Sequence, residues 1–401
     1  MATPAQRQNT WSIDGWYDQA VAGTQGSYVG ISGLYTWGNN LQGQLGQNNL
    51  TKYSSPTQIP GTTWKEVTLS GSYGSSLATK TDGTLWAWGH ASYGEVLGQN
   101  QGAIDLSSPT QIGTGTDWDV PRSGGRGASA IKTDGTLWVW GNNSGGALGL
   151  NQSYNPTFRR KSSPTQIPGT NWSTAFSGGA TTRAGVKTDG TLWTWGRGDH
   201  GQLGINKGGA PGYRSSPTQV GTDTNCDKVE MGFYFCHATK TDGTLWAWGQ
   251  NGAGQLGQNS TQSPGNNGTS SPVQIPGTNW ASISRSYDDG ILATKTDGTL
   301  WSWGGGGGEL GQNNLTSYSS PTQIGSSADW KIDQIMGNVY TAMAVTSSGN
   351  LLSFGANNYG QLGINNTTAQ SSPIQVPGTW TQAYHAGRNA DARQSVALKK
   401  S

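Results

Sequence analysis

The sequence has few cysteines, few charged residues and no long apolar segment. Only Cys226 and Cys236 occur among 401 residues, which excludes a disulfide framework and leaves a single local disulfide open. Charged residues make up 11% of the chain and the formal net charge is +2. The few Lys and Arg are scattered, so a nucleic-acid partner is not expected. No apolar run approaches the roughly 18 residues of a membrane span, so we expect no membrane insertion.

What the sequence has in abundance is a repeat. An aromatic-glycine pair recurs seven times, 51 to 55 residues apart. The copies are Trp37-Gly38, Trp88-Gly89, Trp140-Gly141, Trp195-Gly196, Trp248-Gly249, Trp303-Gly304 and Phe354-Gly355. A period near fifty residues is typical of propeller blades or of a solenoid array. Most of the 19 Trp and 64 Gly therefore belong to a scaffold that is used seven times, and function must be sought where the copies differ.

The residue pattern of a single repeat predicts a propeller blade. The run 77–80 and the run 84–89 flank Asp82-Gly83, which predicts a β-hairpin. On the second run, Trp86 and Trp88 would point to one face while Leu85 and Ala87 point to the other. A strand that is apolar on both faces lies between neighbouring sheets, as in a propeller. A glycine-rich Gly-x-Leu-Gly turn, a polar loop, Ser-Ser-Pro and a further Trp complete the repeat, and Cys226 stands where the fifth copy would place that Trp.

The first and last copies are complementary halves. The run 34–38 lacks a preceding strand, and the run 395–399 resembles the missing one. The sequence therefore predicts an all-β fold, a seven-bladed propeller over residues 31–401, whose ring is closed by pairing of the N- and C-terminal strands. Residues 1–30 lie outside the repeats, and we expect them to cap the ring or to dock it on a larger assembly. Their apolar spacing predicts a short amphipathic helix carrying Trp11, Trp16 and Tyr17.

The repeated pattern Ala-x-Lys-Thr-Asp-Gly-x-Leu-Trp-x-Trp-Gly, followed by Gly-Gln-Leu-Gly, resembles the repeat of the regulator of chromosome condensation family. That resemblance implies a seven-bladed propeller that presents loops to a protein partner; it implies the fold more firmly than an activity. The low charge and the near-identical copies also resemble repeat proteins of tailed bacteriophages.

The residue pattern carries no catalytic constellation. The four histidines, His90, His200, His237 and His385, share no repeat position, and the recurrent Asp residues each precede a turn glycine. The Gly-Trp-Arg-His-Thr motif, which the resemblance assigns to a plant ultraviolet-B photoreceptor of this fold, is absent, as is any phosphate-binding Gly-Lys-Ser/Thr. We therefore expect no enzyme activity, no cofactor and no metal.

The copies differ in two classes of loop. One class precedes the Lys-Thr-Asp-Gly strand and contains Tyr and Arg, which dominate binding hot spots. Its candidate partner-binding residues are Tyr73, Arg122, Arg126, Arg183, Phe233, Tyr234, Arg285, Tyr287, Asp288, Tyr340 and Arg388. The other class follows Gly-x-Leu-Gly and is expanded in three copies. Its candidates are Tyr154, Phe158, Arg159 and Tyr213. Drift on a solvated surface and simple tolerance of insertions are the alternatives.

The functional hypothesis is a binding propeller for a protein or glycan, as a structural or recognition component of a phage virion. The expected location is the virion or the cytoplasm, because residues 1–10 lack the layout of a signal peptide. The alternative is an intracellular regulator, either a GTPase exchange factor or an inhibitor that caps an enzyme. The sequence alone does not name the partner, choose between the two loop faces or fix the oligomeric state.

Overall fold

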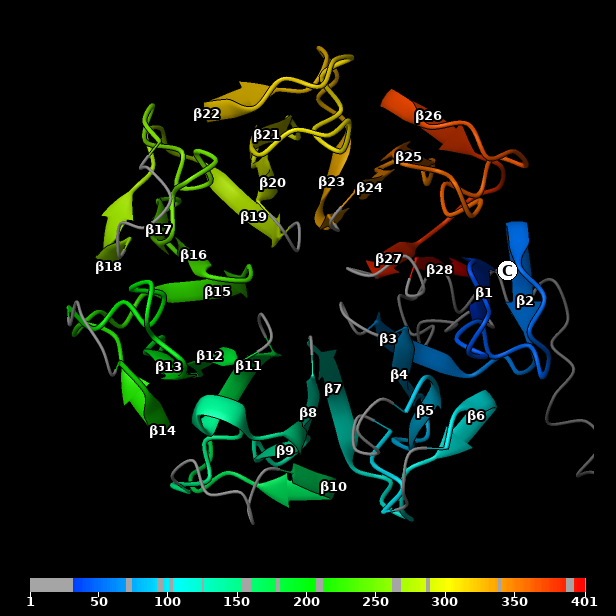
Figure 1. The fold of residues 1–401 in the computed structure, drawn as a ribbon, viewed down its shortest axis with the longest axis horizontal. Coiled ribbons are helices and arrows are strands. Elements are labelled where there is room, and N and C mark those ends of the chain that lie inside the picture. Colours follow the sequence, from blue (N-terminus) through cyan, green and yellow to red (C-terminus); the bar gives the residue numbers. More distant parts are fainter. Residues whose placement is uncertain are drawn as a thin grey trace, which may run out of the picture.

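The computed structural model describes residues 32–69, 74–91, 97–100, 104–124, 126–152, 160–177, 181–206, 212–261, 268–285, 289–337, 340–386 and 393–400. These residues form seven four-stranded antiparallel sheets that stand around a central axis as the blades of a propeller (Figure 1). Apart from strands, the described residues contain one short 3-10 helix, Ser144–Gly146. The predicted all-β, seven-bladed fold is confirmed.

Each blade runs from the axis outward in four strands. The innermost strands, which line the central channel, are β3 (Trp64–Leu69), β7 (Trp118–Ser123), β11 (Trp172–Ser177), β15 (Cys226–Met231), β19 (Trp280–Arg285), β23 (Trp330–Gly337) and β27 (Gln382–Ala386). The second strands are β4 (Ser75–Lys80), β8 (Gly127–Lys132), β12 (Thr182–Lys187), β16 (Phe235–Lys240), β20 (Gly290–Lys295), β24 (Thr341–Thr346) and β28 (Gln394–Lys400).

The third strands carry the aromatic-glycine pair, and the fourth form the outer edge. The third strands are β5 (Leu85–Gly89), β9 (Leu137–Asn142), β13 (Leu192–Gly196), β17 (Leu245–Gly249), β21 (Leu300–Gly304), β25 (Leu351–Gly355) and β1 (Ser32–Gly38). The outer strands are β6 (Leu106–Gln111), β10 (Arg160–Gln166), β14 (Arg214–Gln219), β18 (Thr269–Gln274), β22 (Tyr318–Gln323), β26 (Gln370–Val376) and β2 (Tyr53–Ile59). Because the Ser-Ser-Pro segment lies in these edge strands, its proline costs no central ladder hydrogen bond.

The ring closes within one blade made from both ends of the described chain. Its strand order is β2-β1-β28-β27, and β1 pairs with β28 in an unbroken register from Ser32↔Lys400 to Gly38↔Gln394. Two strands from each end thus complete a single sheet, as the two complementary half repeats predicted.

The core is a set of layers between neighbouring blades. In β5, Leu85, Ala87 and Trp88 are buried and Trp86 is half-buried, so both faces of the strand are covered, as predicted. The indole N–H of Trp86 donates to the Thr84 hydroxyl, which donates to the carboxylate of Asp82 in the hairpin turn. That hydrogen bond from Thr84 lowers the pKa of Asp82. The recurrent aspartates therefore organise turns, in agreement with the sequence interpretation.

A repeated clasp joins each blade to the next. The backbone N–H of Asn48, in the loop after β1, donates to the carbonyl of Ser107 in the neighbouring β6, and the Ser108 hydroxyl donates to the Asn48 side chain. Asn48 has a φ of 56°, a left-handed conformation that asparagine adopts more readily than most residues. Asn365 forms the same clasp with Ser54 and Ser55 across the closing boundary.

Candidate binding face

Both classes of variable loop leave the ring on the same side. In an antiparallel blade, the connection from the first to the second strand and that from the third to the fourth emerge at one end, and the remaining connections emerge at the other. Direct contacts agree: the backbone N–H of Gln250, after β17, donates to the carbonyl of Tyr234, before β16. We call this side the loop face, defined by the first-to-second and third-to-fourth strand connections of all seven blades. The described residues of the two loop classes therefore lie on one side of the ring and not on two separate faces, as the sequence suggested.

The exposed large hydrophobic side chains of the described residues are confined to the loop face. They are Leu41 (51% exposed), Leu50 (59%), Ile104 (59%), Tyr213 (45%), Leu315 (69%) and Tyr340 (40%). Five of them follow a third strand and one follows a first strand. The opposite side, built from Thr-Asp-Gly turns and Pro-Gly-Thr segments, exposes none among the residues described. Single exposed apolar side chains are ordinary, but their restriction to one side of a ring marks that side as the candidate interaction surface.

One aromatic cluster on the loop face joins two neighbouring blades. The rings of His200 and Tyr234 are 4.3 Å apart between centroids, and those of Phe233 and Tyr234 are 4.2 Å apart. Burial lowers the pKa of His200, which favours its neutral form at pH 7. Beside it, the Arg197 guanidinium pairs with Asp199 at 2.6 Å. This cluster is a preformed aromatic and polar surface between β13 and β16.

A second aromatic cluster lies near the closing blade. The guanidinium carbon of Arg393 is 4.9 Å from the ring centroid of Tyr340 and 5.5 Å from that of Tyr359. The Lys52 ammonium is 4.9 Å from the Tyr359 ring. Alternating cations and rings favour a compact surface through cation–π attraction.

The central channel is charged and internally paired. The Arg122 guanidinium donates to the Glu66 carboxylate at 2.5 Å, and Lys228 forms an ion pair with Asp333. Burial and the neighbouring Glu66 carboxylate raise the pKa of Tyr384. The channel volume near these residues is about 420 Å³. These charges therefore pair with one another inside the channel.

The structure relocates two predicted site residues. Arg122 lies in β7 and points into the channel, because the loop that was expected from position 122 begins only after Ser123. Arg183 lies in β12 and is 3% exposed; it occupies an interior position that other blades give to Ser76, Ala128 or Cys236. Neither residue is available on the loop surface as the sequence suggested.

The remaining candidates divide into described and undescribed residues. Phe233, Tyr234, Tyr213 and Tyr340 lie on the loop face, and Arg126 lies there half-buried. Arg285 ends β19, and its side chain lies outside the described part. The candidates outside the described residues are Tyr73, Tyr154, Phe158, Arg159, Tyr287, Asp288, Arg388, and the docking residues Trp11, Trp16 and Tyr17.

Sequence reasoning missed several members of the face. His200 shares no repeat position with the other histidines, and Arg197, Tyr359 and Arg393 are not among the residues that the loop comparison predicts. Tyr359 and His200 both precede the first glycine of Gly-Gln-Leu-Gly, where Gln42 and Ala253 stand in the other two copies, so comparison of the copies could have found both rings.

The other chemical features are modest. Both cysteines are free and buried, so no local disulfide forms between Cys226 and Cys236. The described ranges hold no group of three or more His, Cys, Asp or Glu side chains that could bind a metal ion. Within the same ranges, no helix has the length and apolarity needed to cross a bilayer.

Comparison with known proteins agrees with the geometry. The model of the regulator of chromosome condensation (RCC1) repeat matches residues 33–74, 134–183, 189–238, 242–285 and 348–388. The mitochondrial RCC1 domain-containing protein RUG3 of Arabidopsis thaliana is 28% identical over 378 residues, which cover 86% of this chain and 82% of RUG3. The ultraviolet-B receptor UVR8 of the same plant is 26% identical over 370 residues, which cover 88% of this chain and 80% of UVR8.

The fold is also found in a solved structure. Prp20p from Saccharomyces cerevisiae, described with its binding to Gsp1p and histones, superposes with a TM-score of 0.76 at 17% identity over 92% of both chains. At that identity the likeness concerns the fold alone. Since the repeat model matches more than half of the sequence, this protein belongs to the regulator of chromosome condensation (RCC1) repeat family.

Proposed function

We propose that this propeller is a non-enzymatic scaffold whose loop face binds a protein partner. The observation that carries the proposal is the confinement of the exposed large hydrophobic side chains of the described residues to that face. The two aromatic clusters add preformed tyrosine and arginine surface, the composition typical of interface hot spots. Prp20p, which shares the fold, is described with its binding properties to Gsp1p and histones, and a protein partner for this chain is proposed by that analogy.

The face is tested by photo-crosslinking. A photoreactive amino acid at Leu41 or Leu315 places the probe on the loop face, and the same probe at the exposed Thr62 places it on the opposite side as a matched control. The proposal expects a discrete crosslinked partner from Leu41 or Leu315 and none from Thr62. Equal crosslinking from both sides, or crosslinking from Thr62 alone, would refute the assignment of the face.

We further propose that the partner belongs to a phage virion or to the host surface that a virion meets. The low charge, the near-identical blades and the additional residues 1–30 support this placement. The test is co-sedimentation of the full chain with particles from the source, compared with a chain that lacks residues 1–30. Binding to particles or to host-surface protein or glycan supports a virion role; recovery only in the unassembled fraction contradicts it.

An intracellular regulator is the second candidate, favoured by the relatives. It predicts a soluble partner whose activity changes when the loop face binds. Stimulated nucleotide release from a GTPase of the source, abolished by Tyr340→Ala but retained by Thr62→Ala, would establish an exchange factor. Unchanged release across the candidate GTPases would remove that activity.

A further inference from the structure

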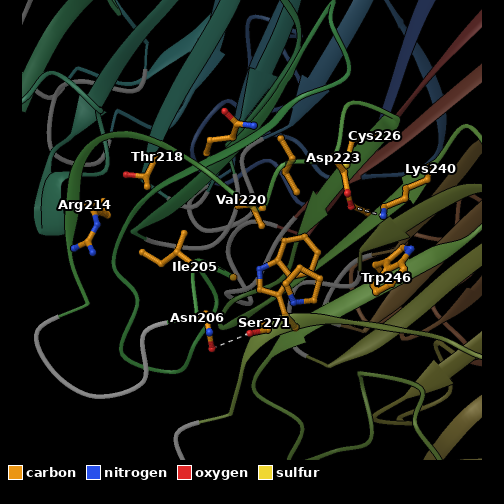
Figure 2. Close-up of a pocket in the computed structure, with 17 residues that line it drawn as sticks. Ile205, Asn206, Arg214, Thr218, Val220, Asp223, Cys226, Lys240, Trp246 and Ser271 are labelled. Carbon is orange, nitrogen blue, oxygen red and sulfur yellow. Dashed lines mark hydrogen bonds and ion pairs between the residues drawn. The ribbon is translucent and has the colours of Figure 1, made fainter.

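One boundary between blades holds a pocket where the other boundaries hold an indole ring. The pocket has a volume of about 590 Å³ and lies between the β11–β14 and β15–β18 sheets (Figure 2). Ile205 and Val220 line it from one blade, and Cys226, Lys240 and Trp246 line it from the next. Pockets of about 300–1,000 Å³ are typical of small-molecule sites.

The pocket lies where a cysteine replaces the tryptophan of the repeat. Cys226 begins β15 and is paired in register with Lys240, as Trp64 is with Lys80 and Trp118 with Lys132. The backbone N–H of Cys226 also donates to the carbonyl of a turn glycine in the preceding blade, as that of Trp118 does. The equivalent niche beside Trp118 has a volume of only about 310 Å³. A cysteine at the tryptophan position therefore leaves a space shaped by its neighbours for an indole.

The groups that surround the missing ring keep the arrangement they have elsewhere. At the β3 boundary, the Lys80 ammonium lies 4.8 Å from the Trp64 ring and 3.8 Å from the Trp86 ring. At the pocket, the Lys240 ammonium lies 4.3 Å from the Trp246 ring and is held by Asp223 at 2.6 Å. Lys240 thus contacts one ring where the corresponding lysine contacts two. A second ring would restore the cation–π pair.

The neighbouring aromatic faces are also preserved. Trp64 packs against Trp86 and Trp88 with centroid distances of 6.2 Å and 5.7 Å. Trp246 and Trp248 are the counterparts of those two rings, and both line the pocket. Where the tryptophan is present, its indole nitrogen is buried without a hydrogen-bond partner among the described residues, as for Trp64, Trp118 and Trp280. The site therefore selects a flat ring by shape and by edge-to-face and tilted ring contacts, and it does not require a ring N–H.

We propose that this pocket binds a small planar aromatic molecule with a ring the size of indole. The six tryptophans at the equivalent position define the occupant: Trp64, Trp118, Trp172, Trp280, Trp330 and Trp380. The pocket lies between two blades, lined by strands of both sheets, so the proposal goes beyond partner binding by the loop face and stands independently of it. Apolar cavities left by removal of a large side chain bind aromatic molecules of matching size.

The test is calorimetric titration of the full chain with indole and with 1-methylindole. We expect a single site with a dissociation constant on the order of 1 mM or tighter for both. Cys226→Trp should weaken binding at least tenfold because the side chain fills the pocket, whereas Cys226→Ala should retain it. Trp280→Cys should create a second site of similar affinity. Equal binding by the wild type and Cys226→Trp, no binding by the wild type, or dependence on the ring N–H would overturn the proposal.

A measurement on the unmodified protein covers the case in which a variant fails to fold. Cys226 lines the pocket and is 8% exposed, whereas Cys236 lies outside the pocket lining, is 0% exposed and serves as an internal control. Saturating indole should slow iodoacetamide alkylation of Cys226 several-fold, as followed by peptide mass spectrometry. An unchanged alkylation rate would contradict occupancy of this pocket.

Discussion

The indole N–H of Trp37 donates to the backbone carbonyl oxygen of Gln361 at 3.0 Å, across 324 positions of sequence. The same contact joins Trp88 to Gln44 and Trp303 to Gln255, each also at 3.0 Å, within neighbouring repeats. The boundary at which the two ends of the ring meet is therefore built like a boundary between consecutive blades. The ring thus closes through the same indole-to-carbonyl hydrogen bond that joins consecutive blades.

The contact between Trp37 and Gln361 requires a glycine at position 363. Gly363 has a φ of +72°, and a Cβ at this position would lie 2.6 Å from Nε1 of Trp37. Gly325 has a φ of +61° with no atom within 4 Å of a built Cβ, which makes it the matched control. We expect Gly325→Ala to cost about 1 kcal/mol from backbone conformation, and Gly363→Ala to cost about 2 kcal/mol more from overpacking. Urea unfolding measures both; equal losses would contradict the contact.

Removal of the C-terminal strand should open the ring. Deletion of residues 394–401 leaves β1 and β27 without the strand that lies between them. We expect the midpoint of thermal unfolding to fall by about 10 °C or more and the transition to broaden, because two strand edges become exposed. Deletion of Ser401 alone is the control. An unchanged melting curve for the longer deletion would show that the termini do not hold the ring together.

His237 should make stability depend on pH. It is 1% exposed, its Nε2 lies 2.9 Å from the Gln255 carbonyl, and burial lowers its pKa to about 4. An unfolded histidine titrates near 6.5, so between pH 6.5 and 4 the unfolded chain binds more protons. The free energy of unfolding should therefore fall by about 2 kcal/mol from pH 7 to pH 5.

The matched variant comes from the repeat itself. Leu77 and Leu292 occupy the position of His237 in other blades, so His237→Leu should fold and should lose this part of the pH dependence. Urea unfolding at pH 7 and pH 5 gives the comparison. The same loss of stability in both proteins would rule out His237 as its source.

The residue at the tryptophan position, at the start of the innermost strand, should affect the free energy of unfolding. Trp280 is 3% exposed, and Trp280→Cys removes its ring from between two blades, with an expected loss of about 3–5 kcal/mol. Cys226→Trp should instead raise the free energy of unfolding by about 1–3 kcal/mol through burial of the added ring. Chemical denaturation tests both. A large loss in Cys226→Trp would mean that this boundary has adapted to the smaller residue.

Most of the fold could be predicted from the sequence because it is repeated. Trp86, Trp88 and the Asp82-Gly83 turn define one blade, and seven copies leave little choice of architecture. Closure followed from the unmatched strands near Trp37 and Val396. The roles of Gly363 and of the asparagine clasps required coordinates, since they depend on contacts between blades.

The candidate site was less predictable because the loop sequences do not repeat from blade to blade, so no pattern indicates where their side chains lie. Tyr213, Phe233, Tyr234 and Tyr340 were found as departures from the repeat. The prediction that Arg183 lies on the surface was wrong. Arginine in a variable segment favours a surface position, but the pairing of Arg183 with Trp195 places it in the interior of the blade. Cys226 was identified at the tryptophan position, but only the packing of Lys240 and Trp246 shows that the exchange leaves a pocket.

The most direct test of the central claim is partner capture by loop-face variants. Wild-type protein, Tyr213→Ala with Tyr340→Ala, and Thr62→Ala would be used as bait in extract from the source, with the captured proteins quantified by mass spectrometry. We expect a defined partner that the wild type and Thr62→Ala both retain and that the double variant, folded as the wild type, captures at least tenfold less. Equal capture by all three baits would contradict the loop face as the binding surface.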